Sequence, residues 1–379
     1  MDYYTVEGKN KSIFKTFAIY YIAMFLFCIV RIVASLGHFP DGKWGDVLST
    51  MIIQIGILFL LPGVLSCVLL KVSPKKVMKS CNFHRCNFVV VLISIGIGIL
   101  SFFINIAVSS LFNGILSFTG YDFNKFPSSS SASSMTIGNF FIDVLIVAVL
   151  PAFCEEFLHR GVVLQGIKHA GYKKAIVISS MLFALLHFNI RQVSYAFVIG
   201  LILGLISVVA KNIWPAIIVH FVNNFISTYI DYAQANGWFM GDLLDSISSA
   251  LTNNNSAMVF VVCVIVLLVV IALLCLLIWR LYRQSIYKSV YKAIDKVYEA
   301  EGSKKDSPIS IDKSDATRDI IENCTLLNLD YHSMQNPIDA VLPKEKSRYK
   351  TIPKDRIFMW GAVVMGALVT LFTYIWGLI

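Results

Sequence analysis

The sequence predicts an all-α protein, a polytopic transmembrane helical bundle of about nine spans. Hydrophobic residues make up 57% of the 379 residues and charged residues only 15%, whereas soluble domains carry roughly 25% charge. The mean hydropathy is +0.71. Apolar runs near the roughly 20 residues that one membrane-spanning helix requires recur along the whole chain. These observations indicate an integral, multi-pass membrane protein.

The apolar runs predict nine spans, at about 14–36, 47–70, 88–112, 137–157, 174–188, 194–210, 213–231, 257–279 and 357–379. The fifth and sixth are short, but neighbouring helices of a bundle can satisfy the polar groups at their ends. The first span is too long for the apolar core of a signal peptide, and no small-x-small cleavage site follows it, so we expect it to be retained.

The loops predict the orientation, because cytoplasmic loops are enriched in Lys and Arg. Fifteen such residues lie from Arg280 to Arg356, whereas the first loop has only Lys43 and the loop at 119–136 only Lys125. The second loop is also rich in them, with Lys71, Lys75, Lys76, Lys79 and Arg85. The pattern places the N-terminus in the cytoplasm and the C-terminus outside. The net charge of +9 then faces anionic lipid, and no nucleic-acid partner is expected.

The chain divides into five regions. They are 1–136, N-terminal helices and loops; 137–231, a helical core; 232–280, an extracytoplasmic loop and the eighth span; 281–356, a cytoplasmic insert; and 357–379, the last span. Within the insert, residues 281–300 place apolar and lysine side chains on opposite helical faces, which is typical of a helix lying on a membrane surface. The serine-rich stretch 127–134 indicates a flexible loop.

The stretch CEEFLHRGVV, at 154–163, places charged groups where a membrane helix is expected. Glu156 and Arg160 are four residues apart, in the favourable order for an ion pair on one helical face. Glu155 shares a face with His159 and has no such permanent partner, so it is a candidate general base. The alternative is that the span ends at Phe157 and the charges mark the cytoplasmic boundary.

Two further spans carry histidines. Phe183 and His187 are four apart in MLFALLHFNI, and His220 and Asn224 are four apart in IIVHFVNNFI. A lone histidine in a span is often a hydrogen-bonded core residue, but three neighbouring spans with polar groups favour one shared site.

The depth of Glu155 and His187 in the membrane limits whether their side chains can meet. If the fourth span ended at Phe157, Glu155 would lie close to the cytoplasmic surface, far from His187. We therefore expect the fourth helix to continue to about Lys168 and to stop at Gly171. The cavity between the spans is then predicted to open towards the cytoplasm.

The stretches EEFLHR, FALLH and HFVNN resemble the EExxxR, FxxxH and HxxxN motifs of the CPBP family of intramembrane glutamic proteases. That family includes the type II CAAX prenyl endopeptidases and bacterial Abi-like relatives linked to bacteriocin self-immunity. The resemblance covers about residues 137–230. It implies an intramembrane endopeptidase, a hydrolase, acting on a membrane-associated peptide or lipidated protein. Short loops and the residue usage favour a bacterial cell membrane.

The resemblance also implies roles for the motif residues. Glu155 and His187 would activate a water, and His220 and Asn224 would stabilise the oxyanion. Glu156 and Arg160 would fix the helix that carries Glu155. These six residues are the predicted catalytic set, and no cofactor is implied.

Other readings of these residues stay open. Phe183 either packs the His187 ring in place or belongs to the ordinary core. Glu155, His187 and His220 could instead form a His₂Glu zinc site, although no HExxH motif is present. A non-catalytic binding, immunity or transport protein is the alternative outside enzymes. Gly200 and Gly204 predict a close helix contact of the small-xxx-small kind.

Overall fold

The computed structural model describes seven stretches of the chain, residues 9–40, 42–71, 73–125, 135–168, 171–242, 267–284 and 356–378. Every regular element within them is a helix, and no strand occurs there. The predicted all-α membrane bundle is therefore confirmed. The loop at 127–134 and most of the insert at 281–356, including residues 285–300 of the predicted surface helix, lie outside the described residues.

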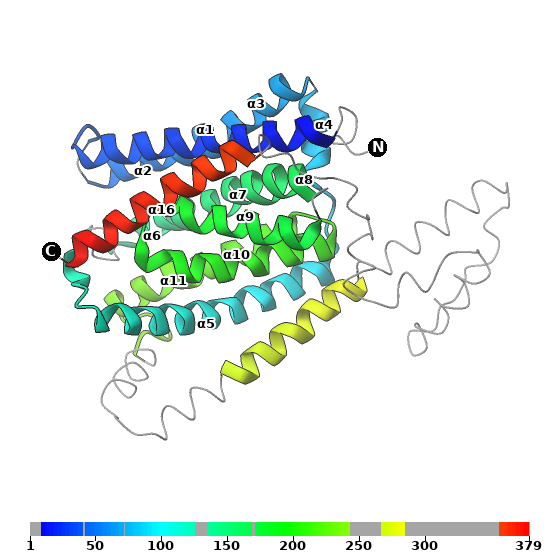
Figure 1. The fold of residues 1–379 in the computed structure, drawn as a ribbon. Coiled ribbons are helices and arrows are strands. Elements are labelled where there is room, and N and C mark those ends of the chain that lie inside the picture. Colours follow the sequence, from blue (N-terminus) through cyan, green and yellow to red (C-terminus); the bar gives the residue numbers. More distant parts are fainter. Residues whose placement is uncertain are drawn as a thin grey trace, which may run out of the picture.

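The helices follow one another in antiparallel order (Figure 1). Their bounds are α1 Lys9–Ser35, α2 Lys43–Met51, η2 Ile52–Leu60, α3 Leu61–Leu70, α4 Pro74–Ser80, α5 Phe88–Phe118, η3 Phe123–Lys125, α6 Ile137–Asp143, η4 Val144–Val149, α7 Leu150–Glu156, η5 Phe157–Val163, α8 Leu164–Ile167, α9 Tyr172–Leu186, α10 Ile190–Ala210, α11 Trp214–Asn236 and α16 Ile357–Leu378. Another helix covers Leu267–Gln284. Two groups of elements are continuous, so that α2 to α3 and α6 to α8 each form one long helix.

Seven helices of the described residues are long and apolar enough to cross a membrane. The other two predicted spans correspond to α9, which has only 15 residues, and to α11, which carries polar residues such as His220 and Asn224. A helix thus occupies each of the nine predicted positions, as far as these are described. Seven helices meet the length and hydropathy requirements, and not nine, because α9 is short and α11 is polar.

Two prolines lie inside the long helices, and π-helical turns precede both. Pro62 follows η2 and Pro151 follows η4. Proline has no N–H to donate, and its ring clashes with the carbonyl four residues earlier. A widened turn before the proline relieves that clash and leaves a carbonyl oxygen without its usual helical donor. Such π turns are frequent at functional sites.

The centre of the bundle is formed by α10, which packs on α9, α5 and α11. A Cβ added to Gly200 would lie 3.0 Å from the Cβ of Ser180, and one added to Gly204 would lie 3.0 Å from Ile176 Cγ2. The predicted small-residue contact is therefore confirmed as the interface of α10 with α9. On the other side, α16 covers α1 and α9.

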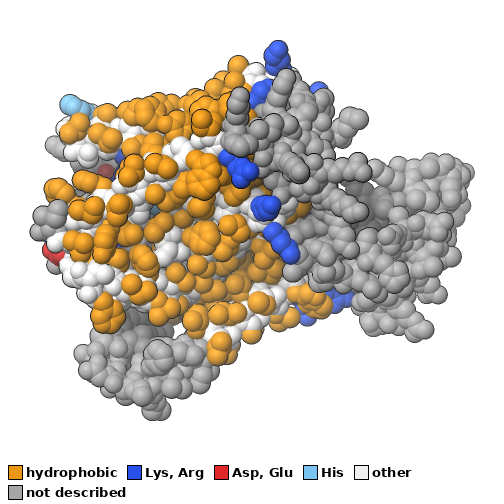
Figure 2. Space-filling view, in the orientation of Figure 1, with side chains coloured by type: hydrophobic (Ala, Val, Ile, Leu, Met, Phe, Trp, Pro, Cys, Tyr) orange, Lys and Arg blue, Asp and Glu red, His pale blue; other side chains and the backbone are white. Residues whose placement is uncertain are grey.

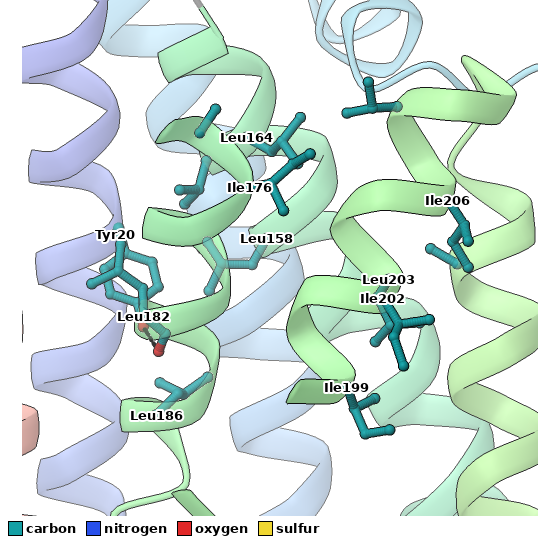
Figure 3. Packing of buried hydrophobic residues seen from close by; sticks show 14 of the residues in the cluster. Tyr20, Leu158, Leu164, Ile176, Leu182, Leu186, Ile199, Ile202, Leu203 and Ile206 are labelled. Atoms are coloured by element: carbon teal, nitrogen blue, oxygen red, sulfur yellow. Dashed lines mark hydrogen bonds between the residues drawn. The ribbon is translucent and has the colours of Figure 1, made fainter. Parts of the chain in front are cut away.

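Apolar side chains fill the space between these helices and also coat the outside. In the interior, Tyr20 on α1 points towards α9, where its hydroxyl donates to the carbonyl of Leu182 at 2.7 Å (Figure 3). Leu158 and Leu186 lie near this contact, whereas Leu203 on α10 belongs to the opposite side of the same core. The outer face is largely hydrophobic (Figure 2), which suits contact with lipid.

The two ends of the bundle differ in charge. We call the end where α1 and α16 begin the basic end, because the segments there carry Lys75, Lys79, Lys173, Lys174 and Arg283 among others. The opposite end is called the far end, and the lysines and arginines of the described residues there are Arg31, Lys43, Lys125 and Arg191. Figure 2 shows Lys and Arg gathered near the basic end. The chain starts α1 at the basic end and finishes α16 at the far end.

Candidate active site

The long helix from Ile137 to Ile167 carries the first motif through the interior of the bundle. It continues past Phe157, as predicted, and every residue from Phe157 to Ile167 is buried. The alternative in which the charges mark the end of a span is therefore wrong. Glu155 lies slightly past the middle of this helix. That position lets it meet residues from the ends of shorter neighbours.

Glu156 is the anchor of a buried polar network. Arg160 Nη1 donates to Glu156 Oε1 at 2.8 Å, and both side chains are 0% exposed. The predicted ion pair is confirmed. The same oxygen lies 3.0 Å from His220 Nδ1, and Arg160 Nη2 donates to the carbonyl of Gly200 at 2.9 Å. Glu156 therefore ties the first motif to α11, a link that the sequence did not predict.

Glu155 has a partner that the sequence analysis missed. The amide of Gln54 on η2 donates from Nε2 to Glu155 Oε1 at 2.9 Å, so this carboxylate, expected to have no ion-pair partner, has a neutral hydrogen-bond partner. Gln54 is the one polar side chain in the run MIIQIGILFLL at 51–61. Polar residues inside apolar spans usually face the bundle interior, and this signal could have identified it. Oε2 of Glu155 is left for other partners.

His187 follows the last residue of α9. Its Nδ1 lies 3.0 Å from the carbonyl of Phe183, and a carbonyl oxygen only accepts, so Nδ1 carries the proton. In the neutral ring, Nε2 is then an acceptor. His159 makes the same kind of bond to the carbonyl of Glu155 at 2.8 Å and is fully buried.

Phe183 holds the imidazole rings of the site. Its ring centroid is 5.1 Å from those of His187 and His159 and 5.7 Å from that of His220, all edge to face. The guanidinium carbon of Arg160 lies 4.6 Å from the same centroid. Phe183 is 2% exposed. It therefore packs the His187 ring, as the first of the two readings proposed, and also fixes its neighbours.

Asn224 bonds to the carbonyl that Pro151 leaves free. Its Nδ2 donates to the carbonyl oxygen of Val147 at 3.0 Å, four residues before the proline. Its side-chain oxygen accepts from Asn223 Nδ2 at 3.3 Å. One N–H of the Asn224 amide stays available. Because Pro151 has no N–H, the carbonyl of Val147 is free to accept from Asn224, and this bond orients the asparagine of the HxxxN motif.

These side chains meet at one cavity of about 560 Å³. Its walls include Glu155, His187, His220 and Asn224, together with Gln54 and Phe183. Glu156 and Arg160 are not among its lining residues and lie behind His220. Of the six predicted catalytic residues, four therefore line one cavity, and the other two, Glu156 and Arg160, lie outside its lining. Their catalytic roles stay a prediction.

The cavity opens at the far end. Its outer lining includes Met135, Asp143, Ser227 and Asp231, which lie on segments near that end. Asp143 forms an ion pair with Lys43. Its Oδ2 accepts from the hydroxyl of Tyr232 at 2.7 Å, and both residues line the cavity.

The cavity was predicted to open towards the end that carries the lysine-rich loops, and this prediction is wrong, because the cavity opens at the far end. The prediction assumed that a helix continuing past Arg160 would extend the cavity. Instead, the residues from Phe157 to Ile167 pack against neighbouring helices. Gly161 lies against Cys81, with an added Cβ 3.1 Å from its Sγ.

No group of three or more His, Cys, Asp or Glu side chains in the described parts of the chain is arranged to hold a metal ion. Glu155, His187 and His220 share the cavity wall, but His220 Nδ1 and His187 Nδ1 already bond to protein oxygens. A zinc ion would have to use the Nε2 atoms.

The fold and the cavity define a class, a polytopic helical membrane protein with a polar site enclosed among its helices. Residues 137–226 match the family model described as type II CAAX prenyl endopeptidase Rce1-like. The segment from α6 into α11 is therefore similar to the CAAX protease family, it contains all three motifs, and their resemblance to that family is confirmed. This family implies a protease in the membrane. No curated protein and no solved structure matches the chain.

Proposed function

We propose that this protein is an intramembrane glutamic endopeptidase, which hydrolyses a peptide bond of a membrane-associated peptide or protein with a water activated by Glu155 and His187. The observation that carries the proposal is the convergence of Glu155, His187, His220 and Asn224 from three helical segments on one cavity. The family match over the same segments supports it.

In the proposed reaction, Glu155 is the general base. Gln54 occupies Oε1, so Oε2 is free to accept a proton from the water, while His187 Nε2 holds the other hydrogen. The water oxygen attacks the scissile carbonyl carbon and forms a tetrahedral oxyanion. The C–N bond then breaks, and Glu155 returns its proton to the leaving amine.

Asn224 and His220 are proposed to stabilise the oxyanion. Asn224 would use its remaining N–H. His220 Nδ1 lies 3.0 Å from Glu156 Oε1, so its Nε2 would donate to the oxyanion from a ring that carries a proton on both nitrogens. One donor of this kind typically contributes about 3–4 kcal/mol to the transition state.

The proposal is tested by comparing peptide termini in cells that carry wild type or Glu155→Ala. We expect a set of membrane-associated termini to disappear in the variant. The matched control is Asp46→Ala, which removes an exposed carboxylate of α2 outside the cavity and should leave the termini unchanged. Identical termini in wild type and the Glu155 variant would remove the main support for a protease.

His187→Ala tests the second catalytic group. Turnover per folded molecule should fall at least about 100-fold, since general acid–base groups contribute 10²–10⁴. The amount of folded protein is measured separately by size-exclusion chromatography in detergent. Equal turnover per folded molecule would contradict the assigned role.

Zinc is the competing chemistry, and we propose that no resident metal is required. The proposal predicts that cleavage by purified protein persists after exhaustive chelation. Activity that vanishes on chelation and returns with zinc alone would instead make Glu155, His187 and His220 metal ligands.

The substrate is proposed to be a peptide at the membrane. The family name indicates a prenylated C-terminal tail, whereas a bacterial chain would process a peptide precursor or act in self-immunity. Incubating the purified protein with matched peptides, with and without a prenyl group, separates these possibilities. Equal cleavage of both would show that the lipid is not read.

A further inference from the structure

The candidate active site is closed on one side of the membrane and open on the other. On the basic side of Glu155, the helix continues through eleven buried residues, Phe157 to Ile167. Phe157, Leu158, Val162 and Leu164 are each at most 1% exposed. No residue of these turns lines the large cavity. Water and peptide therefore have no path to Glu155 through this layer.

On the other side, the lining follows each helix towards the far end. On α1 it includes Phe27 and Arg31, near the last residue of that helix, and on α10 it includes Gln192 and Tyr195, near the first. On α11 it runs from His220 to Tyr232, towards the far end. The outermost residues Arg31, Ser227 and Asp231 are exposed.

The second pocket confirms the separation. It has a volume of about 30 Å³ and lies near the basic end, between Arg85, Asn212 and Gln284. It shares no lining residue with the large cavity. This pocket at the basic end is therefore a small recess that does not lead into the large cavity.

The charge of the two ends places them relative to the membrane. Short loops rich in Lys and Arg stay in the cytoplasm, so the basic end is the cytoplasmic one. The far end, with the open cavity, then faces the opposite side. This conclusion is independent of the catalytic roles, because it uses only the direction of the helices, the packing and the loop charges.

We propose that the candidate active site is entered from the extracytoplasmic side, and that its substrate is a peptide segment lying on that side of a membrane-anchored or exported protein. The substrate assignment rests on the proposed function. The volume of about 560 Å³ is within the range of sites that enclose a small ligand, which suits a short peptide segment. Polar walls, among them Thr50, Asn105 and Gln192, can bond to an extended backbone.

The test uses single cysteines and a membrane-impermeant sulfonated maleimide. Ser227→Cys reports on the cavity and Lys75→Cys on the basic end. Both are labelled in right-side-out and in inverted vesicles, and the modified residue is identified by peptide mass, so that the native cysteines do not interfere. We expect at least tenfold faster labelling of Ser227→Cys in right-side-out vesicles and of Lys75→Cys in inverted ones.

Labelling of both cysteines from the same side, or of Ser227→Cys only from the cytoplasmic side, would overturn the proposal. Asp231→Cys, at the mouth, repeats the measurement if Ser227→Cys does not fold. The labelling is repeated on a Glu155→Ala background, where no cleavage is expected. Opposite labelling without any effect of Glu155→Ala on peptide termini would refute the protease and keep the access route. If Glu155→Ala abolishes cleavage but both cysteines are labelled from the same side, the protease is kept and the access route is refuted.

Discussion

The buried pair between Glu156 and Arg160 gives the sharpest test of what holds the site together. Both side chains are 0% exposed and their charged atoms are 2.8 Å apart. Removing one partner of such a pair leaves an uncompensated charge and costs about 3–5 kcal/mol. Replacing both by apolar residues of similar volume is often nearly neutral. The two kinds of substitution should therefore differ clearly.

We expect Glu156→Leu and Arg160→Met each to lower the free energy of unfolding by about 3–5 kcal/mol. The double variant also loses the bond from Glu156 to His220 and the bond from Arg160 to the Gly200 carbonyl, and each hydrogen bond to a charged group contributes about 1.5–3 kcal/mol. Its loss should be about 3–6 kcal/mol, below the sum of about 6–10 kcal/mol for the single losses. The coupling between the two sites would then be about 3 kcal/mol, at the upper limit of values measured for contacting residues.

The assay is denaturant unfolding of the purified protein in detergent, followed by tryptophan fluorescence. Arg191→Met is the matched control, because Arg191 is half-buried and lies over the ring of Phe123, a contact with an expected contribution of about 0.5–1 kcal/mol. Additive losses in the double variant would refute the reasoning, since they would mean that the two charges are satisfied independently.

Three further predictions concern residues around this pair. Gln54→Leu removes the amide that bonds to the Glu155 carboxylate, the proposed general base, and kcat should fall about tenfold with folded protein unchanged; an unaltered kcat would show that the bond does not orient this carboxylate. Pro151→Ala restores a backbone N–H that competes with Asn224 for the carbonyl of Val147, so kcat should fall while the unfolding midpoint stays the same or rises. An unchanged kcat would show that Pro151 does not act on Asn224. Gly166→Ala places a Cβ against Thr16 and should cost about 1–3 kcal/mol by overpacking, measured against Gly114→Ala, whose added Cβ meets nothing within 4 Å. Equal losses at the two glycines would refute the contact.

The features that the sequence predicted are local along the chain. The ion pair of Glu156 with Arg160 follows from a spacing of four residues, and the continuation of the fourth helix follows from unbroken helical character up to Lys168. The contact at Gly200 was predictable for the same reason, because small residues four apart indicate a close helix approach.

The features that the sequence did not predict join distant segments. Gln54 and Glu155 are 101 residues apart, and nothing in the first helix pair indicates which carboxylate the amide would reach. The direction of the cavity depends on which helix ends separate and which pack. Spacing within a helix carries no information on this, so the sequence predicted an opening at the basic end and the structure has it at the far end.

The short length of α9 bears on how the chain enters the membrane. Fifteen residues extend about 22 Å at 1.5 Å per residue, less than the roughly 30 Å of the hydrocarbon layer. With serines at 179 and 180 and a histidine at its end, this segment is a poor candidate for insertion by itself. Its most extensive packing is against α10, which follows after three residues. During synthesis the two helices should therefore integrate as a single hairpin, and a ribosome paused between them would hold an unanchored α9.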